Sequence, residues 1–141
     1  MEVISGTPPN FADIVAVFPA AKRMGTIFTY GNTVYINGGG KLTEPLRYHE
    51  SVHSRRQLTM TDVNGHAIGP ATWWEKYLSD KEFRLREELI AHAVEYKCYL
   101  AMCGRNQRRI ALKTISSRLS SPLYGNMVSQ KRAVQLLSEA A

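Results

Sequence analysis

The chain has 141 residues, a net charge of +6 and 44% hydrophobic residues. This length suits one domain that buries roughly two thirds of its unfolded surface without a disulfide or a structural metal. No apolar run approaches the roughly 20 residues that cross a bilayer, and the N-terminus lacks the basic segment and apolar core of a secretory signal. The composition therefore excludes a membrane-spanning or exported protein from our expectations and predicts a soluble, cytoplasmic one.

The positive charge is concentrated near the C-terminus. Residues 1–104 hold eleven Lys or Arg and eleven Asp or Glu, whereas residues 105–141 hold seven Lys or Arg and one acidic residue. The basic side chains include Arg105, Arg108, Arg109 and Lys113. Such a segment can contact nucleic acid or an acidic partner. No stacking aromatic residues or binding motif accompany it, so a solvated helix face is the simpler interpretation.

The N-terminal part of the chain predicts one β-hairpin. The apolar run from Asn10 to Pro19 fits a short helix capped by Asn10 or a buried strand, and we favour the helix. Residues 26–30 and 33–37 are then rich in β-branched and aromatic side chains and are separated only by Gly31-Asn32. Two residues of this kind are typical of a tight hairpin turn with glycine at positive φ.

The rest of the chain predicts helices. Three glycines at 38–40 end the hairpin, and Thr43 with Pro45 marks the start of a helix that runs to about Gln57. Capping residues and glycines then predict four further helices, over residues 73–78 (capped by Thr72), 81–103 (capped by Asp80 and ended by Gly104), 107–119, and from Ser129 onward. We expect no second domain, and residues 1–141 form one unit.

Several conspicuous side chains have a structural interpretation. Trp73 and Trp74 stand at the start of a helix, where paired aromatic residues usually anchor it to the core. Cys98 and Cys103 are five residues apart on a helix and therefore on different faces, which predicts two free thiols.

The motif that carries chemistry is His49-Glu50-Ser51-Val52-His53, an HExxH pattern inside the helix predicted from Thr43. Residues four apart lie on one face of a helix, so both imidazoles can bind a single metal ion while Glu50 lies beside it. This is the arrangement of zinc hydrolases, in which the metal activates a water molecule and the glutamate acts as general base. The bland alternative is two ordinary histidines on a structural helix.

A catalytic zinc site usually has three protein ligands, so one more is needed. The metzincin branch would place a third histidine at position 59, but this residue is Thr59. The long helix offers Glu87, Glu88, His92 and Glu95. The last three share a face that can look across at the HExxH helix, and geometry alone leaves the choice among them open.

A family resemblance adds to this reasoning. The segment YLSDKEFRLREELIA, from Tyr77 to Ala91, follows the HExxH as it does in small gluzincin-type zinc metallopeptidases of bacteria and phages. The resemblance extends over residues 26–125 and includes the FTYG hairpin and the LSSPLYG segment. It implies that Glu88 is the third zinc ligand. Many gluzincins carry an acidic residue four positions after that glutamate, whereas this chain has His92.

The resemblance implies where the substrate binds, and the zinc-hydrolase mechanism predicts further roles. The substrate peptide would lie along an edge strand, which we expect near Val34-Tyr35-Ile36. An oxyanion would be stabilised by one of three side chains of the long helix, namely His92, Tyr96 or Tyr99. Glu95 would accept the outer N–H of a zinc-binding imidazole.

Together these observations predict an α+β, zincin-like fold, mostly helical, with a short antiparallel hairpin or sheet beside the HExxH helix. The predicted function is zinc-dependent peptide hydrolysis in a bacterial or phage-infected cell, with a peptide or protein as substrate. The alternative is a non-catalytic accessory protein, such as a phage-associated one, that binds nucleic acid or protein through its basic C-terminal helices.

Overall fold

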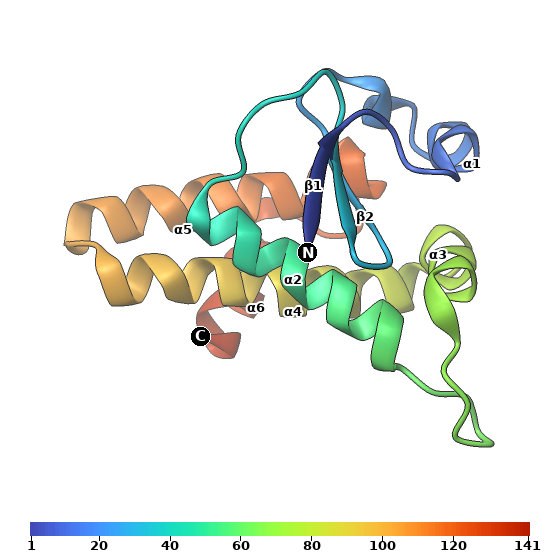
Figure 1. Ribbon diagram of the computed structural model, residues 1–141. Coiled ribbons are helices and arrows are strands. Elements are labelled where there is room, and N and C mark those ends of the chain that lie inside the picture. The colour runs from blue at the N-terminus through green and yellow to red at the C-terminus, as the bar shows by residue number, and fades with distance from the viewer.

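The computed structural model describes all residues, 1–141, and its fold is α+β (Figure 1). A small three-stranded sheet is formed by β1 (Glu2–Ser5), β2 (Ile27–Tyr30) and β3 (Thr33–Ile36). The α-helices are α1 (Phe11–Val17), α2 (Glu44–Thr59), α3 (Gly69–Ser79), α4 (Lys81–Met102), α5 (Arg105–Leu119) and α6 (Gln130–Ala140). Two short 3-10 helices, η1 (Pro19–Lys22) and η2 (Pro122–Tyr124), complete the structure. None of the helices is both long and apolar enough to cross a membrane.

The sheet has the order β1-β3-β2. The predicted hairpin is confirmed, because β2 and β3 pair antiparallel across Gly31-Asn32 and Gly31 has a φ of 60°. β1 pairs parallel with β3, from Glu2 opposite Thr33 to Ser5 opposite Ile36. The expectation that Val34-Tyr35-Ile36 forms an open edge is therefore wrong, because β1 occupies the far side of β3. The free edge near the helices belongs to β2.

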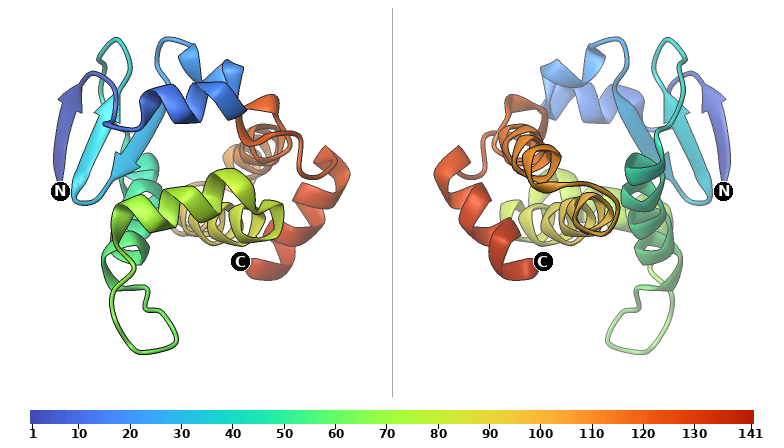
Figure 2. Two further views of the ribbon diagram at one scale, coloured as in Figure 1. Left: turned by 90° about the vertical axis from the view of Figure 1, so that its right-hand side faces the viewer. Right: turned by 90° about the vertical axis from the view of Figure 1, so that its left-hand side faces the viewer.

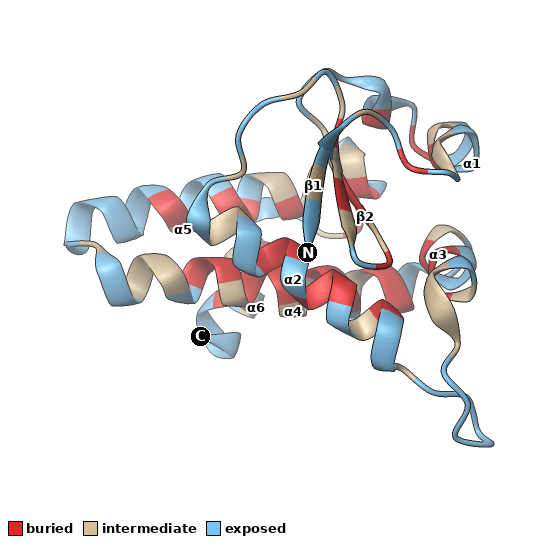
Figure 3. Ribbon diagram, viewed as in Figure 1, coloured by how far each residue is buried: buried red, intermediate tan, exposed pale blue.

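The two central helices begin and end close to their predicted positions. Asp80 caps α4 by accepting hydrogen bonds from the backbone N–H groups of Glu82 and Phe83. Thr43 precedes α2 without a side-chain cap, and Pro45 in the first turn is compatible with the helix because it needs no hydrogen-bond partner there. These helices pack along each other and bring their buried faces together (Figure 3).

The other helices follow the predicted order with shifted ends. α1 is a helix, as favoured, although Asn10 makes no side-chain cap. α3 starts at Gly69 rather than after Thr72, and α5 starts at Arg105 rather than Gln107. Ser129 caps α6 as predicted, by accepting a hydrogen bond from the N–H of Arg132.

The apolar core lies between α4 and the helices that surround it. Trp73 and Trp74 are buried in it, which confirms their predicted anchoring role. Toward the C-terminus, Ile115 and Leu119 of α5 meet Leu137 of α6 in the same cluster. Cys98 and Cys103 are free thiols, as predicted.

The N-terminal segment forms a roof over the two central helices. Figure 2 shows that α1 and η1 extend from the sheet toward the C-terminal segment that follows α5, above α4. η1 and η2 are in contact there. The faces of α2 and α4 that meet below this roof are thus enclosed by the sheet on one side and by α5 and η2 on the other.

Candidate metal centre

The residues of the HExxH motif lie on the face of α2 that meets α4. His49, Glu50 and His53 are at most 5% exposed, although histidine and glutamate are usually solvated. Glu88, His92 and Glu95 approach them from α4 and are equally buried. The helical spacing of four places both histidines one above the other, and the spacing of Glu88, His92 and Glu95 does the same on α4. Six ionisable side chains therefore share one buried interface.

Three of these side chains converge as metal ligands do. The Nε2 atoms of His49 and His53 are 3.2 Å apart. The carboxylate of Glu88 lies 3.4 Å from His53 Nε2 through Oε1 and 3.6 Å from His49 Nε2 through Oε2. Ligand atoms at usual zinc distances around a tetrahedral ion are about 3.3 to 3.5 Å apart. The separation of the two nitrogens is close to an edge of such a tetrahedron, and the Glu88 carboxylate brings one oxygen to a similar distance from each nitrogen.

The hydrogen bonding at this point supports a fit to a cation. Glu88 Oε2 is buried without a hydrogen-bond partner. A buried carboxylate oxygen without a partner costs free energy, and two imidazole nitrogens that face each other can share only one proton. A metal ion bound by Nε2 of His49, Nε2 of His53 and the Glu88 carboxylate would satisfy all three groups.

His49 is held in the orientation that a metal ligand needs. Its Nδ1 lies 2.8 Å from Oε1 of Glu95, and because a carboxylate only accepts, Nδ1 carries the hydrogen. Nε2 is thereby left to face His53 and Glu88. Glu95 is fixed in turn by Arg118 of α5, whose two terminal nitrogens donate to its two oxygens. The expected role of Glu95 thus has a matching contact, and Arg118 is an additional member of the chain.

The charges in the interface explain the pKa shifts. Burial lowers the pKa of His49, but Glu88 and Glu95 outweigh this effect and raise it to about 10. Burial raises the pKa of Glu95, but the hydrogen bonds from His49 and Arg118 outweigh it and lower the pKa to about 2. The interface is rich in carboxylates that stay ionised, and it therefore favours a positive charge at its centre.

Glu88 is fixed by a tyrosine of α3. The hydroxyl of Tyr77 donates to Oε1 of Glu88 at 2.6 Å, while Oε2 faces His49. The neighbouring Glu87, which the sequence also offers as a ligand, faces elsewhere. Its oxygens accept from Arg56 of α2 and from Nε1 of Trp73. Of the two adjacent glutamates, only Glu88 reaches the metal-binding position.

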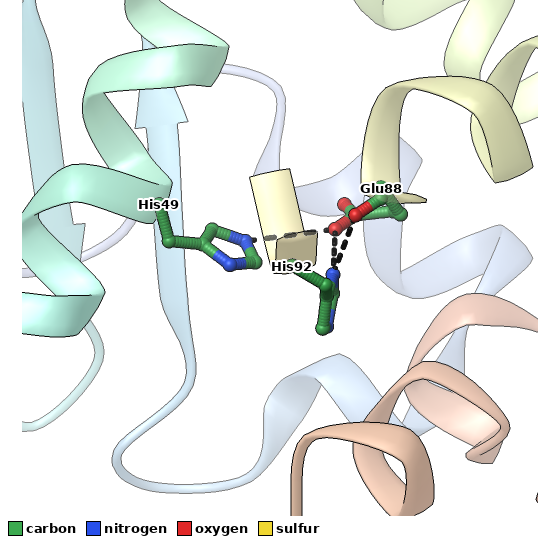
Figure 4. A group of neighbouring side chains, drawn as sticks. All are labelled: His49, Glu88 and His92. Carbon is green, nitrogen blue, oxygen red and sulfur yellow. Dashed lines mark hydrogen bonds and ion pairs between the residues drawn. The ribbon is translucent and has the colours of Figure 1, made fainter. Parts of the chain in front are cut away.

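His92 belongs to the same cluster but is bonded differently. His49, Glu88 and His92 have ligand atoms within 4.8 Å of one another (Figure 4). Nδ1 of His92 is 3.3 Å from Glu88 Oε2 and 2.7 Å from the carbonyl oxygen of Glu88. The carbonyl only accepts, so this nitrogen carries a hydrogen and has no lone pair for a metal. Burial and the nearby His49 lower the pKa of His92 to about 4, so the ring is neutral. We therefore interpret His92 as a support for Glu88.

Glu50 lies beside His49 and is bonded to the sheet. Its Oε2 accepts a hydrogen bond of 2.7 Å from the hydroxyl of Thr29 on β2, and its Oε1 is 3.9 Å from Nε2 of His49. Gln57 of α2 ties the same strand to the helix, because its amide donates to the carbonyl oxygen of Thr29 and accepts from the N–H of Gly31. The strand β2 and the HExxH helix are therefore joined beside the site.

Glu50 lines two cavities. The smaller cavity has a volume of about 40 Å³ and is bounded by His49, His53 and Glu88 together with apolar residues of α1, β2 and α3. The other is a groove of about 690 Å³ that runs between the start of β2, the N-terminal half of α2, the C-terminal half of α4 and α5. Tyr124 of η2 lines both cavities. The groove therefore leads from the surface to Glu50.

The tyrosines of α4 expected near the reaction centre lie in different places. Tyr99 lines the groove, whereas Tyr96 is part of the apolar core and lines neither cavity. Burial and Glu88 raise the pKa of Tyr124 well above its usual value, so its hydroxyl keeps the proton and remains a donor. In the sequence, Tyr124 stands out only as part of the LSSPLYG segment, Thr29 as part of the FTYG hairpin and Tyr77 as the first residue of YLSDKEFRLREELIA. Local patterns do not indicate their contacts, or those of Arg118, because these contacts join distant elements.

Neither protein-family models, nor curated proteins, nor solved structures yield a match to this chain. The resemblance to gluzincin peptidases therefore rests on the residues quoted above, and the chemical interpretation of the site rests on its geometry.

Proposed function

We propose that this protein is a zinc-dependent metallopeptidase with a zincin-like, gluzincin-type site. The observation that carries the proposal is the approach of His49, His53 and Glu88 at separations of 3.2 to 3.6 Å, with Glu50 beside them. The two histidines and one carboxylate match the ligand set of catalytic zinc in peptidases, which leaves a position free for water or substrate. The groove that reaches Glu50 supports a polymeric substrate.

The residues around the site divide the work of peptide hydrolysis. His49, His53 and Glu88 would hold the zinc ion, which would supply Lewis-acid activation of water and of the peptide carbonyl. Glu50, oriented by Thr29, would take a proton from the attacking water and deliver it to the leaving nitrogen. Glu95 would keep Nδ1 of His49 protonated so that Nε2 stays available.

A hydroxyl at the junction of the two cavities would assist the carbonyl oxygen. Tyr124 is better placed for this role than Tyr96 or Tyr99, because of these three only Tyr124 lines the smaller cavity together with Glu50, His49, His53 and Glu88. His92 is less suited, because its Nδ1 already donates to a carbonyl oxygen. We assign the oxyanion donor to Tyr124 on this basis.

The substrate would pair with the free edge of β2. In the antiparallel hairpin with β3, the backbone groups of alternate residues point away from the partner strand. Ile27 is such a residue and also lines the groove. An extended peptide that added a strand there would pass Glu50.

The proposal is tested with three proteins: the wild type, Glu88→Ala and Glu50→Gln. We expect the wild type to bind zinc and cleave peptides, and Glu88→Ala to lose most of its zinc affinity. Glu50→Gln should retain zinc but lose cleavage by about 10² to 10⁴-fold, because the proton acceptor is removed while the ligands stay. The measurements are elemental analysis, zinc titration and peptide cleavage followed by mass spectrometry.

Exposed glutamates give matched controls. Glu82→Ala on α4 and Glu75→Gln on α3 make the same chemical changes at exposed positions and should leave both measurements unchanged. A wild-type protein that binds no zinc at micromolar concentration would overturn the proposal, as would a Glu50→Gln protein that cleaves at the wild-type rate.

A further inference from the structure

The groove that reaches Glu50 has a side branch of about 360 Å³ between η1 and α5. The branch shares Thr26, Thr114 and Arg118 with the groove, so the two cavities are adjacent. Its polar lining consists of two arginines and four hydroxyl side chains, namely Arg23, Arg118, Thr26, Thr114, Ser117 and Ser121. No acidic side chain lines it, in contrast to the groove, which is lined by Glu50 and Glu95.

The polar groups of the branch retain capacity for a ligand. Arg23 takes part in none of the ion pairs of the structure, which pair only Arg56 and Arg118 among the arginines. Arg118 donates to Glu95 through its two terminal nitrogens, and a guanidinium has five N–H groups in all. The hydroxyls of Thr114, Ser117 and Ser121 donate to no group of the protein, although serine and threonine hydroxyls bond readily to nearby backbone. Unpaired guanidinium and hydroxyl donors without an opposing acid match an anion with several acceptor oxygens.

The branch lies where a side chain of a bound peptide would enter it. Thr26 lines the smaller cavity, the groove and the branch, and it precedes Ile27, whose backbone faces the free edge of β2. A peptide paired with Ile27 would therefore have a neighbouring side chain, or its own C-terminus, next to Arg23 and Arg118. The side chain or C-terminus bound there would lie within a few residues of the peptide bond that Glu50 would act on.

We propose that this branch binds a carboxylate of the peptide substrate, held by Arg23 and the free donors of Arg118. The inference rests on the proposed peptidase function for its meaning, since it names the substrate class of that site. The carboxylate belongs either to an Asp or Glu side chain or to the C-terminus of the peptide. Both sources offer the same planar pair of oxygens that a guanidinium binds best.

The test measures peptide binding and so does not depend on cleavage. The zinc-loaded Glu50→Gln protein is titrated with the peptide acetyl-Ala-Ala-Glu-Ala-Ala-amide and with its Gln counterpart. A second pair, acetyl-penta-alanine with a free C-terminus and the same peptide with a C-terminal amide, tests whether the C-terminal carboxylate is bound. Binding is followed by amide NMR shifts of Thr26, Ser117 and Ser121. We expect one of the two carboxylate peptides to bind about fivefold or more tightly than its uncharged partner.

Substitutions of Arg23 decide whether the branch is responsible. Arg23→Gln should abolish the preference for the carboxylate, and Arg23→Glu should reverse it in favour of a peptide with Lys in place of Glu. Arg109→Glu on α5 makes the same change of charge outside the groove and the branch, and it should preserve the preference. Equal binding of both members of each pair, or a preference that survives Arg23→Glu, would overturn the inference.

The outcome separates this inference from the proposed function. If the wild type cleaves peptides but the paired peptides bind equally, the function stands and the carboxylate site does not. If the Glu peptide binds through Arg23 but no peptide is hydrolysed by the zinc-loaded wild type, the binding site stands and the peptidase proposal fails.

Discussion

The helix α4 contributes to two buried regions of opposite chemistry. Toward α2 it presents Glu88, His92 and Glu95, and toward α5 and α6 it joins an apolar cluster that includes Leu119 and Leu137. His92, Leu119 and Leu137 are each 0% exposed, so the two regions are equally well excluded from water. Burial of apolar side chains stabilises the fold, whereas burial of ionised groups costs free energy that their mutual pairing only partly returns.

The contrast assigns different tasks to the two sides of one helix. The apolar side supplies stability and holds α4 in place. The polar side keeps ionised groups at fixed separations. Such an arrangement does not add to the stability of a protein core. Proteins commonly accept such a cost at a functional site. Substitutions on the two sides should therefore affect different measurements.

The largest expected effect is on the apolar side. Leu137→Ala should lower the free energy of unfolding by about 2 to 5 kcal/mol, because it leaves a cavity in a fully buried cluster. Leu136→Ala removes the same atoms at a half-buried position and should lower it less. Urea denaturation of the metal-free protein measures both. Zinc affinity of the folded protein should not change, and a large fall in affinity for Leu137→Ala would show that the two sides are not separate.

The next effect is on the polar side. Arg118→Gln should weaken zinc binding by about 10 to 100-fold, because Glu95 loses the side chain that holds it against His49. Arg118→Lys should be intermediate, since lysine cannot donate from two nitrogens in one plane. The measurement is competition with a chelator of known affinity. Arg109→Gln, on the exposed side of the same helix, is the matched control, and equal losses for both variants would contradict the prediction.

The smallest effect concerns the end of α4 and should leave the site unchanged. Asp80→Ala removes the side chain that caps the helix and should lower the free energy of unfolding by about 1 kcal/mol. Thr43→Ala is the comparison, because Thr43 precedes α2 without making a side-chain cap, and it should have less effect. Thermal denaturation measures both. If Thr43→Ala were less stable than Asp80→Ala, the interpretation that only Asp80 caps its helix would be wrong.

Local signals in the sequence are enough to predict the two helices that carry His49, His53 and Glu88. Thr43 and Pro45 located the start of α2, Asp80 located α4, and the helical spacing of His49 and His53 put them on one face. The choice of Glu88 as third zinc ligand rests on a family resemblance, because spacing alone does not separate it from His92 and Glu95. These predictions concern residues within one helix, where periodicity is informative.

Contacts between elements that are distant in the sequence cannot be predicted from such local signals. β1 has only four residues and is defined by its pairing with β3, so the sheet order and the position of the open edge could not be inferred from the hairpin. Arg118 belongs to the basic segment 105–141, for which the sequence favours a solvated helix face, yet its guanidinium lies against Glu95, 23 residues earlier in the chain. The partners that orient a site come from tertiary packing, which local patterns do not specify.

The carbonyl oxygen of Thr29 accepts hydrogen bonds from both Gln57 and Nε1 of Trp74. The outward-facing carbonyl oxygen of Thr29 is therefore occupied. A peptide that added a strand to this edge of β2 would find free backbone partners only at Ile27. Under the proposed function, the backbone contacts to a bound peptide would therefore lie mainly on one side of the bond to be cleaved.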